Sequence, residues 1–295
     1  MVTQLTAARL ATLKLAQLKH AAFLLGLPSA GTKPVLQTAI GRKVDGVSSG
    51  PKRVLSVDMG IRNLAYCVLE HDGTASRVTA WQRLDLLKQH EEQSEDGRVS
   101  DHTALFTPAV LSLTAYGVTK ELLAYKPDAL LIERQRFRSN SGPAIAEWTV
   151  RVNMLESMLW ACLQTLKSTG TGAAVDMHEV SPARVGDFWT AEAPLKPSER
   201  AVSRGQKGVL RWEEVAATKK RSKVTKNDRK DIVRAWMNGD GEVDIAFTGE
   251  AKETALSFGK KRSGAKLDDL ADCLLQAAAW VRWEDNARRM KKLLM

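Results

Sequence analysis

The sequence predicts an α/β protein in which a mixed sheet is flanked by helices and a small N-terminal helical hairpin precedes the sheet. Two observations support this class. Short runs of β-branched and apolar residues alternate with longer segments whose apolar residues recur at helical spacing. From residue 54 onward the order of these segments is three strands, a helix, a strand, a helix, a strand and a helix. That order is typical of a sheet covered by helices.

The individual elements follow from the local pattern. The run that begins at Val54 is apolar until Asp58, and a turn at Asp72-Gly73 separates the second strand from the third. The run from Ala129 is apolar until Glu133. Strands are therefore expected over 54–60, 65–69, 77–84, 129–133 and 174–180, and helices over 103–125, 144–167, a segment ending near Met237, and a C-terminal segment from about residue 266.

Length and composition exclude several classes of protein. The 295 residues are 44% hydrophobic, which is ample for a buried core. The three cysteines are far apart and form no C-x-x-C pair, so neither a disulfide scaffold nor a zinc site is expected. No run of about 18 uncharged apolar residues occurs, which argues against a membrane span. No G-x-x-x-x-G-K-[ST] loop occurs either, so no nucleotide cofactor is expected.

Two segments carry most of the positive charge. Residues 1–57 contain eight lysines and arginines and one acidic residue, and residues 204–234 contain eleven basic and four acidic residues. The formal net charge is +10, so the rest of the chain is net −4. One basic segment alone is typical of a solvated surface. Two separated basic segments on a slightly acidic body favour a nucleic-acid partner, because lysines and arginines bind phosphates by releasing counterions.

The N-terminal segment predicts the helical hairpin. Apolar residues at helical spacing indicate a helix over Ala7–Leu27, and Pro28 and Gly31 then form a turn. A second helix is expected over Lys33–Ile40, and its start beside the Lys33 side chain suits a phosphate. The string L-G-L-P-x-x-G-T-K resembles the SAP motif, a DNA-binding hairpin. A plain helical hairpin and a mitochondrial targeting peptide are the alternatives.

Glycine, serine and proline after the hairpin predict a flexible linker. Residues 41–52 have the composition of a linker, and the linker between the two predicted domains is assigned to residues 46–52. The predicted division is therefore a SAP-like DNA-binding hairpin at 1–45 and one larger domain at 53–295.

Acidic residues mark the ends of two predicted strands and the start of the last helix. Asp58 and Glu133 end apolar strands, where a buried acid is costly unless something compensates it. Asp268, Asp269 and Asp272 lie within the first turns of the C-terminal helix, where 269/272 and 268/272 each share a face. Each acid alone is typical of a strand end or a helix cap. Together they indicate a Mg²⁺ site, since carboxylate oxygens are the ligands that this ion prefers. Two such ions can support phosphodiester hydrolysis.

The order of these motifs resembles the ribonuclease H-like nuclease fold. More narrowly, V-D-M-G-I-R-N-L-A at 57–65, I-E-R-Q-R-F-R at 132–138 and K-L-D-D-L-A-D at 266–272 resemble the fungal mitochondrial Holliday junction resolvases, the RuvC-like Cce1/Ydc2 family. The resemblance extends from about residue 8 to 280 and includes a SAP-like N-terminal hairpin. Asp58, Glu133 and Asp272 match the family's acids by position, and the fourth acid is either Asp268 or Asp269.

The resemblance implies a function and its requirements. It implies a mitochondrial homodimer that cuts two strands symmetrically at a four-way DNA junction during recombination, with two Mg²⁺ (or Mn²⁺) ions per active site. Lys266, next to the acids, is expected to steady the charge that develops on the phosphate. Basic residues after Glu133 and in the second basic segment are expected to contact DNA, although solvated loops are the alternative for both. The predicted DNA contacts are Lys33, Arg134, Arg136, Arg138, Lys219, Lys220, Arg221, Lys223 and Lys226.

Two other functions remain open from the sequence. The first is another ribonuclease H-like nuclease, which would cut RNA–DNA hybrids as a monomer. The second is a non-catalytic SAP-type DNA architectural protein. The acids at 58, 133, 269 and 272 argue against this second function, because a protein that only binds phosphates is better served without them.

Overall fold

A computed structural model describes residues 4–48, 50, 52–88, 106–135, 147–170, 175–191, 224–240, 243–260 and 267–294. The chain forms two compact units. The first unit comprises residues 1–50, 183–225 and 278–295, and the second comprises residues 51–182 and 226–277. No described helix is both long enough and apolar enough to cross a membrane.

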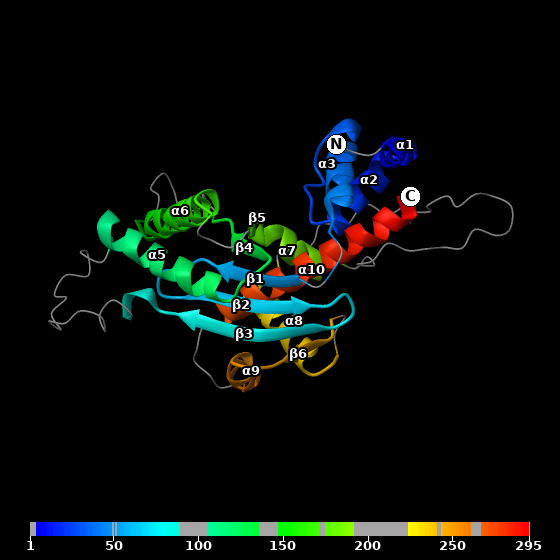
Figure 1. The fold of residues 1–295 in the computed structure, drawn as a ribbon. Coiled ribbons are helices and arrows are strands. Elements are labelled where there is room, and N and C mark those ends of the chain that lie inside the picture. The colour runs from blue at the N-terminus through cyan, green and yellow to red at the C-terminus, as the bar shows by residue number, and fades with distance from the viewer. Residues whose placement is uncertain are drawn as a thin grey trace. The chain divides into compact units, whose positions relative to one another are not determined.

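The second unit is built on a mixed sheet (Figure 1). Its strand order, within the described residues, is β5-β4-β1-β2-β3-β6. The strands β1, β2 and β3 are antiparallel neighbours, whereas β4 is parallel to β1, β5 to β4 and β6 to β3. This confirms the predicted α/β class. The strands are β1 (Lys52–Asp58), β2 (Leu64–His71), β3 (Ser76–Leu84), β4 (Ala129–Glu133), β5 (Asp176–Val180) and β6 (Ile245–Phe247).

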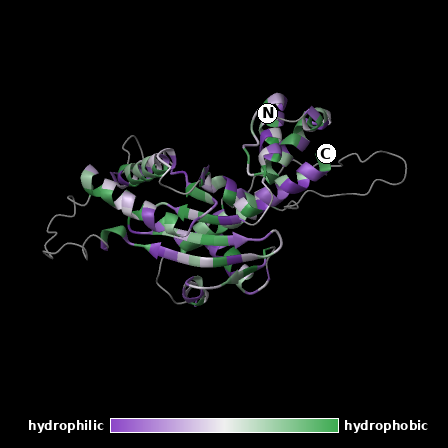
Figure 2. Cartoon of the chain, viewed as in Figure 1, coloured by the Kyte–Doolittle hydropathy of each residue, from purple (hydrophilic) through white to green (hydrophobic). Residues whose placement is uncertain are grey.

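Different helices cover the two faces of the sheet. Leu55 and Val57 of β1 share a buried core with residues of α5 (Pro108–Ala124) and α6 (Glu147–Ser168). Because strand residues alternate between faces, Ser56 and Asp58 point the other way. On that side the beginning of α10 (Asp268–Leu294) packs against the sheet, since its Gln276 contacts Ser56. Figure 2 shows hydrophobic colour in the central strands and mixed colours along β3. The burial patterns agree, since β1 and β2 are almost continuously buried, as expected for strands covered on both faces.

Each strand and helix predicted from residue 54 onward has a counterpart, and the residues that the structure describes include three further elements that were not predicted, α7 (Pro182–Trp189), β6 and α9 (Ala251–Gly259). Two of these are short: β6 has three residues, and α7 has eight. Pro182 closely follows the predicted strand 174–180 and starts a helix, since proline fits the first helical turn. The third is α9, next to β3 and β6. Helix α8 (Lys226–Met237) ends where the sequence predicted.

The predicted first helix, Ala7–Leu27, is wrong. The chain forms α1 (Gln4–Thr12) and α2 (Leu15–Leu24) instead. Lys14 separates them because its backbone is extended (φ −70°, ψ 157°) and its N–H donates to the side chain of Gln17 at 2.8 Å. That hydrogen bond satisfies a backbone donor at the start of α2, which favours a new helix over continuation of the old one.

The second predicted helix, Lys33–Ile40, is too short. Helix α3 runs over Lys33–Gly46, so it includes residues 41–46 of the predicted linker. Gly41 and Val44 are both buried, which continues the apolar face of the helix one turn beyond Ile40. The glycines at 41 and 46 suggested a linker from composition alone, whereas burial of this face stabilises the helix.

The core of the first unit joins the two ends of the chain. Leu18, Leu24 and Ile40 of the N-terminal helices pack in one cluster with Met290 and Leu294 of α10. The end of α10 therefore belongs to the same unit as the N-terminal helices, whereas the predicted domain 53–295 placed it with the sheet. Nothing in the sequence marks this boundary because α10 continues as one helix through it.

A glycine substitution tests the packing of this first unit. Gly26 has φ +66°, and a Cβ atom there would lie 2.2 Å from Cδ2 of Trp283. We expect Gly26→Ala to lower the free energy of unfolding by about 1–3 kcal/mol, through overpacking and backbone strain. Urea denaturation measures this. The control is Gly46→Ala, where nothing lies within 4 Å of the added atom. Equal stability of the two variants would contradict the packing described.

Candidate active site

Two neighbouring strands each end in an acidic residue. Strand β1 ends at Asp58 and strand β4 ends at Glu133. The strands are parallel, with Val57 opposite Ile132, so the next residue of each strand is one of these acids. Asp58 is 9% exposed, which is low for a carboxylate, and Glu133 is half-buried. Parallel pairing thus brings together two acids that are 75 residues apart in the sequence.

Helix α10 brings further acids to the same edge of the sheet. It begins at Asp268 and Asp269, and Asp272 follows one turn later. Asp272 is largely buried, with 18% of its side chain exposed. The sequence predicted this placement from the helical spacing, because residues three and four apart share a helix face.

The Gln276 side chain fixes α10 against the two acid-bearing strands. Its Nε2 atom lies 2.9 Å from the hydroxyl of Ser56, 3.3 Å from the carbonyl oxygen of Val57 and 3.4 Å from that of Leu131. These contacts are buried, and they involve β1 and β4 just before their terminal acids. Gln276 lies one turn beyond Asp272 in α10. Its contacts with β1 and β4 therefore also fix the position of Asp272 relative to the ends of those strands.

Two further contacts hold α10 on β2 and β3. The indole N–H of Trp81 donates to the carbonyl oxygen of Leu270 at 2.9 Å. The thiol of Cys67 lies 3.3 Å from the carbonyl oxygen of Cys273. All four groups are buried within the described core. The first turns of α10 are therefore tied to several strands, and none of these anchors was predicted from the sequence.

The carboxylates act on one another electrostatically. Burial raises the pKa of Asp58 well above its ordinary value, and the nearby Glu133, Asp272 and Asp269 raise it further. Burial also raises the pKa of Asp272, although a hydrogen bond from Arg229 opposes this. The structure thus brings Asp58, Glu133, Asp269 and Asp272 within electrostatic range. Mutual repulsion of this kind is relieved by a bound cation.

Asp268 lies in a different environment from Asp269. Burial alone would raise the pKa of Asp268, but a hydrogen bond from Lys226 lowers it below the ordinary value. The charge of Asp269 is among the causes that raise the pKa of Asp58.

Helix α8 supplies basic residues to the acids of α10. Lys226 forms an ion pair with Asp268, and the guanidinium of Arg229 donates to Asp272 at 2.5 Å. Lys226 was predicted to contact DNA, whereas in the structure its ammonium group pairs with the carboxylate of Asp268. Arg229 was considered only as one member of the densest basic run of the second segment, a plausible DNA-binding element, and not as a partner of the acids. Its spacing of three residues from Lys226, on one helix face, was the available signal.

The donor set has the chemistry of a site for a hard divalent cation. Four carboxylates on three backbone elements provide only oxygen ligands, which Mg²⁺ and Mn²⁺ prefer. Among the described residues, no three His, Cys, Asp or Glu side chains stand close enough as they lie to form a metal centre. The ion pairs to Asp268 and Asp272 give a physical reason, since both direct carboxylate oxygens toward α8.

The remaining predicted residues are partly outside the described residues. Arg134 forms an ion pair with Glu179 at 2.9 Å and donates its backbone N–H to Val180 of β5. Lys33 is exposed at the first residue of α3. The predicted residues that lie outside the described ranges are Lys266, Arg136, Arg138, Lys219, Lys220, Arg221 and Lys223.

The anchoring role of Gln276 can be tested by its effect on stability. Gln276→Leu keeps much of the volume but removes the amide donors, which leaves the Ser56 hydroxyl and two strand carbonyls short of a partner. We expect the free energy of unfolding to fall by about 1–3 kcal/mol. The control is Gln164→Leu on the exposed face of α6, where a change within about 0.5 kcal/mol is expected. A Gln276→Leu protein as stable as this control would refute the anchoring role.

Comparison with known proteins places this arrangement in a family. A cruciform cutting endonuclease of Schizosaccharomyces pombe, named as mitochondrial, is 29% identical over 96% of this chain and 96% of its own. Its Saccharomyces cerevisiae namesake is 25% identical over 95% of this chain and 85% of its own. The crystal structure of the yeast mitochondrial Holliday junction resolvase Ydc2 matches with a TM-score of 0.64, at 27% identity, over 96% of this chain and 99% of that chain. The family described as mitochondrial resolvase Ydc2 / RNA splicing MRS1 matches residues 54–290, and this chain belongs to it.

Proposed function

We propose that this protein is a mitochondrial Holliday junction resolvase, an endonuclease that cuts four-way DNA junctions by metal-dependent phosphodiester hydrolysis. One observation carries the proposal most directly. Asp58, Glu133, Asp269 and Asp272 converge at one edge of the sheet within a chain of the resolvase family. The names of the relatives support the substrate and the location, since both are called mitochondrial cruciform cutting endonucleases.

The acids at this edge would hold the cations. Asp58, Glu133 and Asp272 are the proposed ligands, with Asp269 as the fourth because it acts on Asp58. Two Mg²⁺ (or Mn²⁺) ions would supply charge stabilisation for attack on the phosphodiester and for the leaving oxygen. Burial of Asp58 excludes water from one side of the set and keeps its carboxylate in place. Gln276 keeps the helix acids in register with the strand acids.

The basic residues would position the DNA. Lys33 at the start of α3 is exposed and suits a phosphate, as proposed for the SAP-like hairpin of residues 1–45. Arg134 lies directly after the Glu133 strand end, although Glu179 shares its guanidinium. A homodimer would present two such sites and would match the two-fold symmetry of a junction cut on two strands. Further proposed DNA contacts are Lys226, Arg136, Arg138, Lys219, Lys220, Arg221 and Lys223, with Lys266 at the scissile phosphate.

The family description also names RNA splicing, so a function in nucleic-acid binding without hydrolysis is the other candidate. The acids favour the nuclease over this activity and over a DNA architectural role. Burying Asp58 beside Glu133 costs free energy, and the negative charges of the two carboxylates repel a polyanion. A protein that only bound nucleic acid would gain nothing from these clustered carboxylates, whereas a metal-dependent nuclease requires them as ligands.

An Asp58→Asn variant tests the proposed ligand. We expect cleavage of a four-way junction to fall by more than about 10²-fold, since even outer-shell partners of metal ligands cost up to that much when mutated. Junction binding should be unchanged or tighter, because a negative charge is lost and no basic residue is touched. Gel assays with labelled junctions in Mg²⁺ measure both. The control Asp240→Asn, at an exposed residue after α8, should cleave normally. Full cleavage by Asp58→Asn would defeat the assignment.

Substrate choice separates the resolvase from the other ribonuclease H-like nuclease. We expect the protein with Mg²⁺ to make paired, symmetric nicks in a four-way junction and to leave a linear duplex and an RNA–DNA hybrid of the same sequence intact. Denaturing gels of the three end-labelled substrates give the result. Preferential cutting of the hybrid would select the other nuclease, and binding without cutting of any substrate would select the architectural role.

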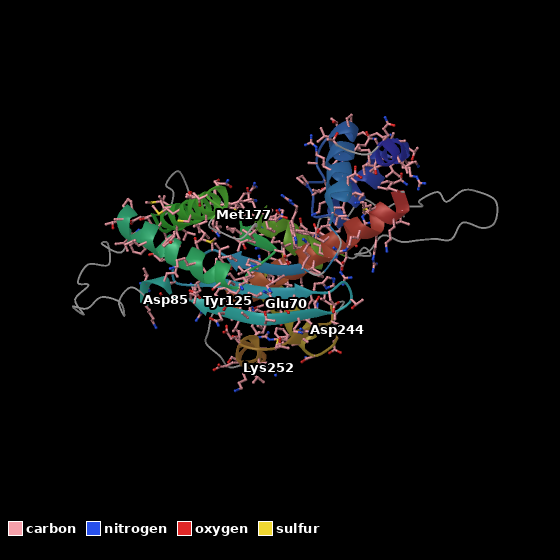
Figure 3. All side chains as sticks on the ribbon, viewed as in Figure 1. Glu70, Asp85, Tyr125, Met177, Asp244 and Lys252 are labelled. Atoms are coloured by element: carbon pink, nitrogen blue, oxygen red, sulfur yellow. The ribbon has the colours of Figure 1, made fainter. Side chains whose placement is uncertain are left out.

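A lysine substitution tests the hairpin. If Lys33 contacts a phosphate, Lys33→Gln should lower the slope of log K for junction binding against log[salt] by about 1. Fluorescence anisotropy over a salt series measures the slope. Lys252→Gln, on the exposed side of α9 (Figure 3), is the control and should leave the slope unchanged. Equal slopes for the wild type and Lys33→Gln would refute the contact.

A further inference from the structure

Helix α8 directs a guanidinium at one of the proposed metal ligands. Arg229 donates to Asp272 at 2.5 Å, and the pair is largely buried, with 27% of the arginine side chain and 18% of the aspartate side chain exposed. Lys226 also pairs with an acid of α10, Asp268, but 70% of its side chain is exposed. Because exposed ion pairs contribute little, Arg229 is the stronger counter-cation of the two.

Arg229 interacts with more than one of the acids. Burial tends to lower its pKa, but the hydrogen bond and charge of Asp272 and the charges of Glu133 and Asp58 raise it above the ordinary value. The guanidinium therefore lies in the field of three proposed ligands from β1, β4 and α10. This is the position in which a positive charge offsets the repulsion among them.

The bond to Asp272 has a consequence for metal binding. A carboxylate that accepts a guanidinium hydrogen bond directs its oxygen and its negative charge toward that donor. While this bond is made, Oδ2 of Asp272 shares its negative charge with the guanidinium, so less of that charge is available to a cation beside Asp58 and Glu133.

Not every donor of the Arg229 guanidinium forms a hydrogen bond within the described part of the chain. Its Nε atom is buried and donates no hydrogen bond to any described residue. A buried donor without a partner costs free energy, so the ion pair is weaker than one in which all donors are satisfied. Val233 and Trp236, on later turns of α8, are buried and anchor the helix independently of Arg229. The arginine can therefore leave Asp272 without unfolding α8.

We propose that Arg229 is a displaceable counter-cation of the metal site, which holds Asp272 until a divalent cation takes that carboxylate. The inference rests on the proposed function, because it requires Asp272 to be a ligand. Metal loading is then an exchange of one cation for another, and the observed metal affinity is lower than the intrinsic affinity of the acids by the fraction of Asp272 that is free.

Isothermal titration calorimetry with Mn²⁺, without DNA, tests the exchange. The full-length Arg229→Gln protein should bind Mn²⁺ about tenfold more tightly than the wild type, as expected if about one tenth of Asp272 is free in the wild type. Lys226→Gln should tighten binding by about fivefold or less, as for an exposed ion pair. The matched control is Lys230→Gln, which removes a charge that acts on Asp268 through space without a described ion pair. Lys230→Gln therefore reports the effect of losing one positive charge without losing an ion pair. Its gain in Mn²⁺ affinity should be the smallest of the three variants.

The outcomes distinguish this inference from the proposed function. Mn²⁺ affinity of Arg229→Gln equal to or weaker than that of Lys230→Gln would overturn the exchange and leave the metal site standing. No Mn²⁺ binding by the wild type and by every variant would overturn the metal site itself. Should Arg229→Gln fail to fold, Arg229→Lys keeps the charge with a weaker hold and should bind Mn²⁺ more tightly than the wild type. Binding no tighter than the wild type would overturn the exchange.

Discussion

The buried amide of Gln276 is the contact on which the candidate active site depends. It joins α10 to β1 and β4 through the Ser56 hydroxyl and two strand carbonyls. Trp81 and Cys67 also hold α10 on β2 and β3, but the Gln276 amide is the described contact that joins this helix to both acid-bearing strands. With it, Asp272 stays one helical turn away from a fixed point on the two strands. An aspartate near the C-terminus thereby faces acids more than 130 residues earlier in the chain.

Bringing the acids together costs free energy of folding, and packing elsewhere in the second unit offsets this cost. Asp58 is buried beside Glu133, and their repulsion opposes folding. The apolar core shared by β1, α5 and α6 stabilises the sheet that carries them. Arg229 offsets part of the remaining charge at Asp272. Repulsion of this kind among neighbouring carboxylates is typical of sites that bind a cation, because the bound charge relieves it.

Much of this arrangement could be predicted from the sequence. The strands were predicted because apolar runs end abruptly in an acid, as at Asp58 and Glu133. Parallel strands present these ends at one edge, so the convergence of the acids followed. The placement of three aspartates at the start of α10 was predicted by spacing, but the sequence left open whether Asp268 or Asp269 is the fourth ligand. The structure shows an ion pair between Lys226 and Asp268 and an effect of the Asp269 charge on Asp58.

Other features depend on long-range contacts that no local pattern reveals. Gln276 is the single polar residue in the apolar stretch 273–281 of α10, and its sequence neighbours give no sign of its partners. Arg229 is one of eleven basic residues in its segment, and only the position of α8 singles it out. The division of the first helix at Lys14 depends on one side-chain cap from Gln17. The core that joins residues 18–40 to residues 287–294 forms between opposite ends of the chain.

The central claim is that these carboxylates form one metal site, and anomalous diffraction from crystals soaked in Mn²⁺ tests it most directly. The account predicts anomalous density bounded by the carboxylates of Asp58, Glu133 and Asp272, with the guanidinium of Arg229 moved away from Asp272. Anomalous density only at other acids, or none with the Arg229–Asp272 ion pair intact at saturating Mn²⁺, would contradict it.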